Sequence, residues 1–232
     1  MKYMGSKNRI AKYILPLMLK NRKDGQYWVE PFVGGANMID KVTGNRIGSD
    51  INKYLIACLD AIANGWIPDS LWSESFYNEL RNNKDDYDPA MIGYAGFALS
   101  YAGKWFGGWC RDSEGKRNYP LEAHKNAIKQ QPKLKGIKFI TSSYNDLDIP
   151  SNSIIYCDPP YASTTKYKDD FDHDKFWIWC EQKVKEGHSV YVSEYNAPSN
   201  WNCIWEKEII SSLTQDTGSK KATEKLFTFK KA

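Results

Sequence analysis

An α/β fold, in which a helical insertion interrupts a mostly parallel sheet, is predicted by three observations on this chain of 232 residues. Short apolar runs alternate with helical periodicity up to residue 65, as in consecutive strand–helix units. From Trp66 to Gln131 the chain becomes rich in aromatic, Asn and charged residues. Regular apolar runs then resume, so one sheet with a long insertion accounts for the whole pattern.

The individual elements follow from the spacing of apolar residues. Ile10, Ile14, Leu17 and Met18 predict a helix over residues 7–20. After it we expect a strand at 27–30, a helix at 35–42, a strand at 47–50 and a helix at 52–64. The insertion has helical stretches near 73–83 and 89–102, and the strands beyond it are expected at 138–141, 154–157, 189–193, 203–210 and 224–229, with a crossover helix over 176–184.

The predicted division of the chain is a core of residues 1–65 and 136–232 with an insertion at 66–135. A chain of this length is expected to form one α/β domain that buries about 70% of the surface of its unfolded form. Two complete catalytic domains do not fit in it.

Residues 156–161, Tyr-Cys-Asp-Pro-Pro-Tyr, place an acidic turn directly after a predicted buried strand. The lone pair of an exocyclic amine on a base is delocalised into the ring, so the amine attacks a methyl donor only when acceptors draw its hydrogens out of plane. Asp158 offers a carboxylate oxygen and Pro159 a main-chain carbonyl, and Pro160 helps to fix the turn in advance. Tyr161 offers a face for stacking a base. The alternative is an ordinary Pro-Pro turn that ends a strand.

A glycine turn follows the first predicted strand and comprises Glu30, Pro31, Phe32, Val33, Gly34, Gly35 and Ala36. Glycine lets the backbone approach a ligand closely at the carboxyl end of a strand, where open α/β sheets bind cofactors. Because the third small residue is Ala36, the turn is not the dinucleotide fingerprint G-x-G-x-x-G. A tight strand-to-helix connection is the alternative.

Asp50 stands at the end of the second predicted strand, about 20 residues after the glycine turn begins. A carboxylate in this position hydrogen-bonds the ribose hydroxyls of a nucleoside cofactor. The alternative role of Asp50 is the N-cap of the next helix.

Composition excludes some classes of protein and favours others. The net charge of +4 supports a polyanionic partner only slightly, whereas nine Trp and fifteen Tyr indicate aromatic surfaces, for base stacking or interface packing. Five scattered cysteines and three histidines predict neither a metal site nor a disulfide framework. No apolar leader or membrane span is recognisable, so we expect a cytoplasmic protein.

Residues 103–119 combine basic and aromatic side chains around a Glu-Gly turn. They predict a protruding hairpin or loop that contacts phosphates, a base edge or the gap left by a flipped base. The candidate DNA-binding residues are Lys104, Trp105, Trp109, Arg111, Lys116, Arg117 and Tyr119. A solvated basic hairpin packed by its own tryptophans is the alternative.

These motifs, in this order, resemble those of the adenine-specific DNA methyltransferases of bacteria and phages with an Asp-Pro-Pro-Tyr motif, in the branch of the GATC adenine methylases. Nearly the whole chain is covered: residues 2–7 are similar to the N-terminal cofactor motif, 30–36 to the glycine motif, 158–161 to the catalytic motif, 190–196 to the strand beside the target base and 224–229 to the last strand. The resemblance implies a Rossmann-like methyltransferase fold with a terminal antiparallel hairpin, S-adenosylmethionine as cofactor, and a flipped adenine of double-stranded DNA as substrate. The cofactor-binding residues that it implies are Tyr3, Lys7, Glu30, Pro31, Phe32, Gly34, Gly35, Ala36, Asp50, Asp146 and Asp158.

Several points stay open at the level of the sequence. Gly107-Gly108 replaces the Asn-Gly of the family's recognition hairpin, and Glu30 stands where Asp is common in other branches. Lys7 otherwise only starts a helix, and Asp146 otherwise belongs to an ordinary turn. A mobile loop at 166–171 is expected to close over the base. The other candidate functions are methylation of cytosine N4 or of a glutamine amide, and non-catalytic DNA binding by a protein that keeps the fold. We expect no metal and a monomer.

Overall fold

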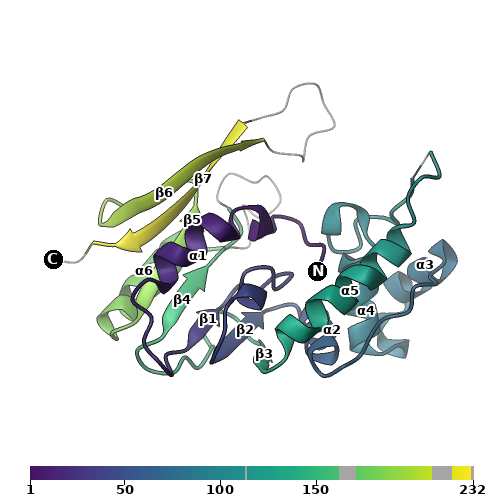
Figure 1. Cartoon of the computed structure of the whole chain (residues 1–232), viewed down its shortest axis with the longest axis horizontal. Coiled ribbons are helices and arrows are strands. Elements are labelled where there is room, and N and C mark those ends of the chain that lie inside the picture. Colours follow the sequence, from purple (N-terminus) through teal and green to yellow (C-terminus); the bar gives the residue numbers. More distant parts are fainter. Residues whose placement is uncertain (113, 162–170, 211–220, 231–232) are drawn as a thin grey trace.

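The computed structural model describes residues 1–112, 114–161, 171–210 and 221–230. In this part of the chain a sheet of seven strands has the order β3-β2-β1-β4-β5-β7-β6 (Figure 1). The strands are β1 (Trp28–Glu30), β2 (Arg46–Asp50), β3 (Ile137–Thr141), β4 (Ile154–Cys157), β5 (Ser189–Glu194), β6 (Trp201–Ile210) and β7 (Lys221–Phe229). The first five are parallel, and β7 is antiparallel to both β5 and β6. This is the predicted fold class, with the terminal antiparallel hairpin in place.

The helices agree with the predicted ones except at two places. They are α1 (Ala11–Leu19), α2 (Lys53–Ala63), α3 (Glu74–Asn82), α4 (Pro89–Phe97), α5 (Tyr119–Leu134) and α6 (His173–Lys185), with 3₁₀ turns η1 (Lys7–Arg9), η2 (Ile39–Lys41), η3 (Lys84–Asp86) and η4 (Tyr101–Gly103). The predicted helix at 35–42 is wrong, since only η2 forms there. Ala36 has a φ of 56°, in the left-handed region that an α-helix cannot include.

Helix α5 is the element that the spacing of apolar residues failed to predict. Its buried stripe consists of Ala123, Ala127, Gln130 and Leu134, which have helical spacing but little apolar bulk. The helix begins at a clear cap, because the Asn118 side chain accepts a hydrogen bond from Leu121 N. A search for caps would therefore have found it.

Two hydrophobic clusters cover the two faces of the sheet. Successive strand residues alternate between them: Trp28 and Ile154 belong to the cluster that contains α1, and Val29 and Ile155 to the cluster that contains Phe176 of α6. Figure 1 shows α1 lying over the sheet near β4 and β5. The central strands are therefore buried on both faces, as parallel strands usually are.

The segment between β2 and β3 packs beside the edge of the sheet that β3 forms. In Figure 1, α2, α3, α4 and α5 lie together next to β3. Gly93 allows α4 to lie directly on α2, because a Cβ atom at that position would come 1.9 Å from the Tyr54 carbonyl oxygen. Apolar residues of these helices belong to the same cluster as α1, so they continue the core of the sheet.

Candidate active site

The sequence motifs meet at one edge of the sheet. Strand β1 pairs in parallel with both β2 and β4, so the carboxyl ends of the three strands point the same way. The glycine turn follows β1, Asp50 ends β2, and Asp158 follows β4 directly. Segments more than 100 residues apart in sequence therefore lie at one edge of the sheet.

A buried ion-pair cluster surrounds the Asp158 carboxylate. Lys7 Nζ lies 3.3 Å from Asp158 Oδ1 and 3.3 Å from Glu224 Oε2. The Tyr161 hydroxyl donates to the same Glu224 oxygen at 2.8 Å. The side chains of Lys7 and Glu224 are 7% and 9% exposed, whereas that of Asp158 keeps 22%. Asp158 is therefore the charged member of the cluster that an incoming group reaches most easily.

Burial and neighbouring charges set the protonation states in this cluster. Burial raises the pKa of Asp158 to about 6, with Glu224 adding to the rise and Lys7 opposing it. Burial alone lowers the pKa of Lys7, but the carboxylates of Asp158 and Glu224 outweigh that effect and hold the pKa above its usual value. At neutral pH Asp158 is therefore mostly a carboxylate and Lys7 is an ammonium.

Tyr161 is held on two sides. Lys7 Nζ lies over its ring, 4.4 Å from the centroid, and the Tyr195 ring meets it edge-on at 4.6 Å. Burial, together with the charges of Asp158 and Glu224, raises the pKa of Tyr161 well above its usual value, so the hydroxyl stays a donor. Tyr195 follows β5, and the structure places its ring against Tyr161, at the end of the turn of residues 158–161.

The glycine turn is shaped by the N-terminal segment. Gly34 has a φ of 48°, and a Cβ atom built on it would come 2.7 Å from the Tyr3 ring. A Cβ atom on Gly35 would lie 2.7 Å from Tyr3 Cβ. The two glycines are thus required by the close packing of Tyr3 on the turn, a reason that no local pattern reveals.

Asp50 does not cap a helix, so the alternative role considered for it is wrong. Asn52 is the N-cap of α2, because its side chain accepts from Tyr54 N and Leu55 N. The Asp50 carboxylate instead accepts from Gly34 N at 3.3 Å and from Asn52 N at 3.0 Å, and burial raises its pKa. It thereby ties the glycine turn to the end of β2, where a carboxylate suits a ribose diol.

The other predicted cofactor residues line the same edge with different degrees of exposure. Glu30 is buried and accepts from Trp28 Nε1 at 2.7 Å, and burial raises its pKa well above the usual value. Pro31 is buried, Phe32 packs on Tyr144 with ring centroids 5.4 Å apart, and Asp146 is exposed and accepts from Ser143 Oγ at 2.9 Å. Glu30 therefore has a partner inside the protein, while Asp146 is accessible in the turn after β3.

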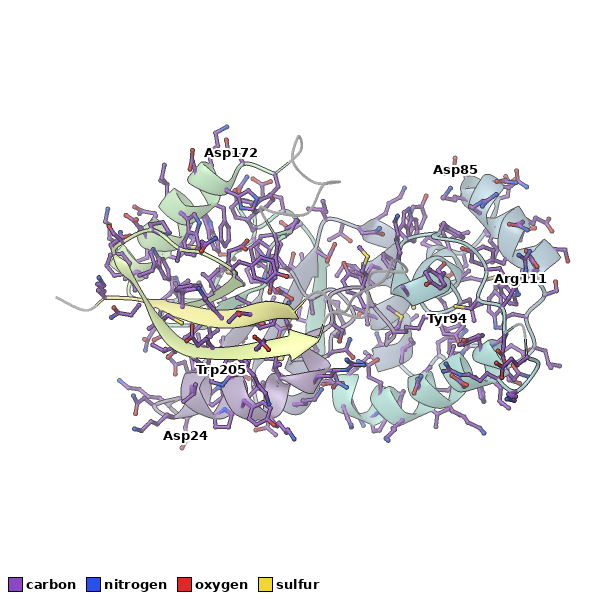
Figure 2. All side chains as sticks on the ribbon, turned by 90° about the horizontal axis from the view of Figure 1, so that it is seen from above. Asp24, Asp85, Tyr94, Arg111, Asp172 and Trp205 are labelled. Carbon is purple, nitrogen blue, oxygen red and sulfur yellow. The ribbon has the colours of Figure 1, made fainter. Side chains whose placement is uncertain are left out.

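The predicted DNA-binding residues lie on the insertion. Arg111 is 72% exposed and pairs with Glu74, and in Figure 2 it lies on the side away from Asp172 at the start of α6. Trp105 stacks on Tyr54 at 5.6 Å, and Trp109 packs on Tyr77 at 5.5 Å. The tryptophans thus have packing partners, as in the alternative interpretation of this segment.

Residues 109–112 and 114–118 form no regular hairpin and belong to a loop before α5. A single bridge joins Ser100 to Trp109. Asp112 Oδ2 accepts from Lys116 N at 2.6 Å and from Arg117 N at 2.7 Å, which closes a tight turn. Arg117 also pairs with Glu122, Lys104 follows η4, and Tyr119 begins α5. The predicted loop at 166–171 lies outside the described residues except for Phe171, which packs on Phe32.

Glu224 is the site residue that the sequence analysis missed. It lies on β7 two residues before Leu226, and the two side chains face the same side of the sheet, where Leu226 belongs to the cluster of α1. A charged residue at an inward strand position was the available signal, because such residues need a buried partner.

The described residues contain no group of three or more His, Cys, Asp or Glu placed to hold a metal ion. Among the helices described, none combines the length and apolar character needed to cross a membrane.

The amino-acid sequence matches the model of a protein family over most of its length. The model of the D12 class N6 adenine-specific DNA methyltransferases matches residues 3–90 and 112–224. The chain therefore belongs to this family. It is an adenine-specific DNA methyltransferase, and DNA is its substrate.

Two curated relatives agree with the family. A DNA adenine methylase of Vibrio cholerae serotype O1 is 27% identical over 201 residues, covering 72% of this chain and 72% of its own. The type II methyltransferase M.FokI of Planomicrobium okeanokoites is 24% identical over 207 residues, covering 75% of this chain and 31% of its own.

Solved structures of more distant proteins were also compared. The tRNA methyltransferase TrmI from Aquifex aeolicus gives a TM-score of 0.41 at 11% identity, covering 100% of this chain and 71% of its own. The structure of SMU.472, a putative methyltransferase complexed with SAH, gives a TM-score of 0.37 at 12% identity, covering 96% of this chain and 52% of its own.

The methyl donor of this family is S-adenosylmethionine, and the residues at the sheet edge fit it. Asp50 offers a partly exposed carboxylate to a ribose diol, and the glycine turn is tied to that carboxylate. Asp50 and the backbone of the glycine turn are the groups that would hold the nucleoside.

Replacing Asp50 should weaken cofactor binding. Asp50→Ala leaves ribose hydroxyls without an acceptor and frees the glycine turn, so we expect a loss of about 1–3 kcal/mol in affinity for S-adenosylmethionine. Isothermal titration calorimetry measures the affinity of the variant and of the wild type for S-adenosylmethionine. Asp60→Ala, on the exposed face of α2, is the matched control and should bind normally. Unchanged affinity of Asp50→Ala would limit Asp50 to holding the turn.

The pH dependence of methyl transfer should report Asp158. Because the pKa of Asp158 is raised to about 6 and the ionised carboxylate is a stronger acceptor for the amine than the protonated acid, kcat/KM should fall as pH drops through about 6. Steady-state rates between about pH 5 and pH 8 test this, with cofactor affinity measured at each pH as a control. A flat profile down to pH 5 would contradict the role given to this carboxylate.

Proposed function

We propose that this protein is a site-specific methyltransferase that transfers a methyl group to N6 of an adenine extruded from duplex DNA. The observation that carries the proposal is the position of Asp158. Its partly exposed carboxylate follows β4, lies beside Tyr161 and is ionised at neutral pH. A carboxylate of this kind is the acceptor that an adenine amine needs.

Each residue of the catalytic turn, residues 158–161, has its own role in the proposed reaction. Asp158 and the Pro159 carbonyl accept the two N6 hydrogens, which frees the nitrogen lone pair from the ring. Tyr161 stacks on the base, and Pro160 keeps the turn rigid. S-adenosylmethionine supplies an electrophilic methyl group on sulfur when bound. The methylated amine then loses one proton, which the Asp158 carboxylate beside it can accept.

Cytosine N4 is the second candidate acceptor, because its amine has the same chemistry. The adenine-specific family assignment favours N6 of adenine. A glutamine amide and a non-catalytic role are disfavoured by the same assignment and by the intact Asp158 turn.

We also propose that residues 66–135 recognise the target sequence. The family match leaves out residues 91–111, a stretch that includes Trp105, Trp109 and Arg111. Residues 109–112 and 115–120 line an open surface depression. Arg111, Lys116 and Arg117 are tied to exposed carboxylates in pairs that water screens, and such pairs exchange readily for DNA phosphates. The monomeric state and the cytoplasmic location stay predictions.

Mapping of modified bases tests the proposed reaction. Unmethylated plasmid DNA treated with the protein and S-adenosylmethionine should carry N6-methyladenine within one short sequence. Asp158→Ala should lower the rate about 10²–10³-fold, because one preorganised acceptor is lost, while cofactor affinity stays within a few-fold. Asp174→Ala, at an exposed position of α6, is the control and should methylate normally. Modified cytosine, or a normal rate for Asp158→Ala, would overturn the proposal.

Replacing Arg111 tests whether the loop before α5 contacts DNA. Arg111→Ala should relax base preference at one position by about 1–3 kcal/mol if the guanidinium reads a base, or weaken binding to all sequences and flatten the salt dependence if it holds a phosphate. Binding titrations on duplex DNA at several salt concentrations distinguish the two. Lys185→Ala, an equal loss of charge on α6, should change little. If Arg111→Ala behaves like Lys185→Ala, the loop is not a DNA contact.

A further inference from the structure

The Lys7 ammonium stands where the target amine has to bind. It lies 3.3 Å from Asp158 Oδ1 and 4.4 Å from the centroid of the Tyr161 ring. The proposed reaction needs an adenine amine that donates to Asp158 while its ring lies on Tyr161. An ammonium also donates hydrogen bonds and also lies on an aromatic face, so Lys7 makes both of these contacts itself.

Lys7 cannot simply be released into a buried site, because an unpaired ammonium there is costly. Glu224 already provides a second carboxylate, 3.3 Å from Lys7 Nζ. The same Glu224 oxygen accepts the Tyr161 hydroxyl at 2.8 Å, which fixes the carboxylate beside the ring. Glu224 comes from β7, whereas Asp158 follows β4, so the two carboxylates approach Lys7 from different elements.

We infer that Glu224 is a positioning residue for methyl transfer: it retains the Lys7 ammonium when the adenine amine takes its place on Asp158. In the free enzyme Lys7 bridges both carboxylates. In the complex Lys7 keeps Glu224 as its carboxylate partner, together with the Gly5 carbonyl oxygen 3.3 Å away, and Asp158 becomes the acceptor for the amine. This inference rests on the proposed roles of Asp158 and Tyr161 in adenine methylation.

Several titratable groups interact electrostatically with Asp158 in this arrangement. They are Lys7 from η1, Glu224 from β7, Tyr161 in the catalytic turn, Glu30 at the end of β1, Tyr156 on β4 and Tyr195 after β5. Of these, Glu224 is a carboxylate whose charge raises the pKa of Asp158 and Lys7 is the cation that lowers it. A change in the pairing of Lys7 therefore appears in the ionisation of Asp158.

The substitution Glu224→Gln tests the inference. It keeps an acceptor for Tyr161 but removes the charge that holds Lys7, so Lys7 pairs more strongly with Asp158 and competes with the amine. We expect kcat/KM on unmethylated plasmid DNA at neutral pH to fall about tenfold, the equivalent of one charge-assisted hydrogen bond. The acid limb of the pH profile should move to lower pH, because the negative neighbour of Asp158 is gone and its positive neighbour is closer.

Two further variants complete the experiment. Glu206→Gln makes the same chemical change at an exposed position of β6 and should leave rate and pH profile unchanged. Glu224→Asp retains the charge and should restore the acid limb toward that of the wild type. If Glu224→Gln does not fold, Glu224→Asp decides the question, because its shorter side chain places the carboxylate farther from Lys7. An acid limb displaced to lower pH than in the wild type supports the inference, and a lower rate with an unmoved limb overturns it.

A lower rate with an unmoved acid limb would overturn the inference, since a Glu224 that only orients Tyr161 predicts that result. An unchanged rate would overturn it as well. A wild-type protein that fails to methylate DNA would instead overturn the proposed function. The failure of one proposal is therefore distinguishable from the failure of the other.

Discussion

The buried Lys7 ammonium is the interaction on which the rest of the site depends. It joins three segments that are distant in sequence, namely η1, the turn after β4, and β7. Removing one partner of a buried pair leaves an uncompensated charge and costs about 3–5 kcal/mol. The N-terminal segment, the turn of residues 158–161 and the final hairpin are therefore coupled through this one ammonium.

Much of the fold could be predicted because its strands follow simple patterns. Strand β4 is a continuous apolar run, and β1 is apolar at Trp28 and Val29 before it ends at Glu30, as expected for parallel strands buried on both faces. The two errors in the predicted helices also have local causes. A left-handed Ala36 stops the helix expected after β1, and no apolar pattern reports a positive φ at alanine. Helix α5 buries Ala and Gln, so its inward face has little hydrophobic signal.

The place of the site could be predicted, but the partners within it could not. Parallel strands bring their carboxyl ends together, so the turns at 31–36, Asp50 and Asp158 had to meet. Which side chain pairs with which depends on contacts across the whole fold. Glu30 bonds to Trp28 inside the core, and Lys7 takes Glu224 from the last strand as a partner. Spacing in the sequence contains no information on such long-range pairs.

The charges of the cluster suit the reaction that the family performs. One ammonium and two carboxylates leave a net charge of −1 when all three are ionised, and positive charge develops on N6 as the methyl group arrives. Without Lys7, burial and Glu224 would raise the pKa of Asp158 further, and a protonated Asp158 would be a weaker acceptor with no negative charge to stabilise the methylated amine. Without Glu224, Lys7 would cancel the charge of Asp158 completely. The pair of residues thus keeps Asp158 both ionised and available, a balance that neither residue achieves alone.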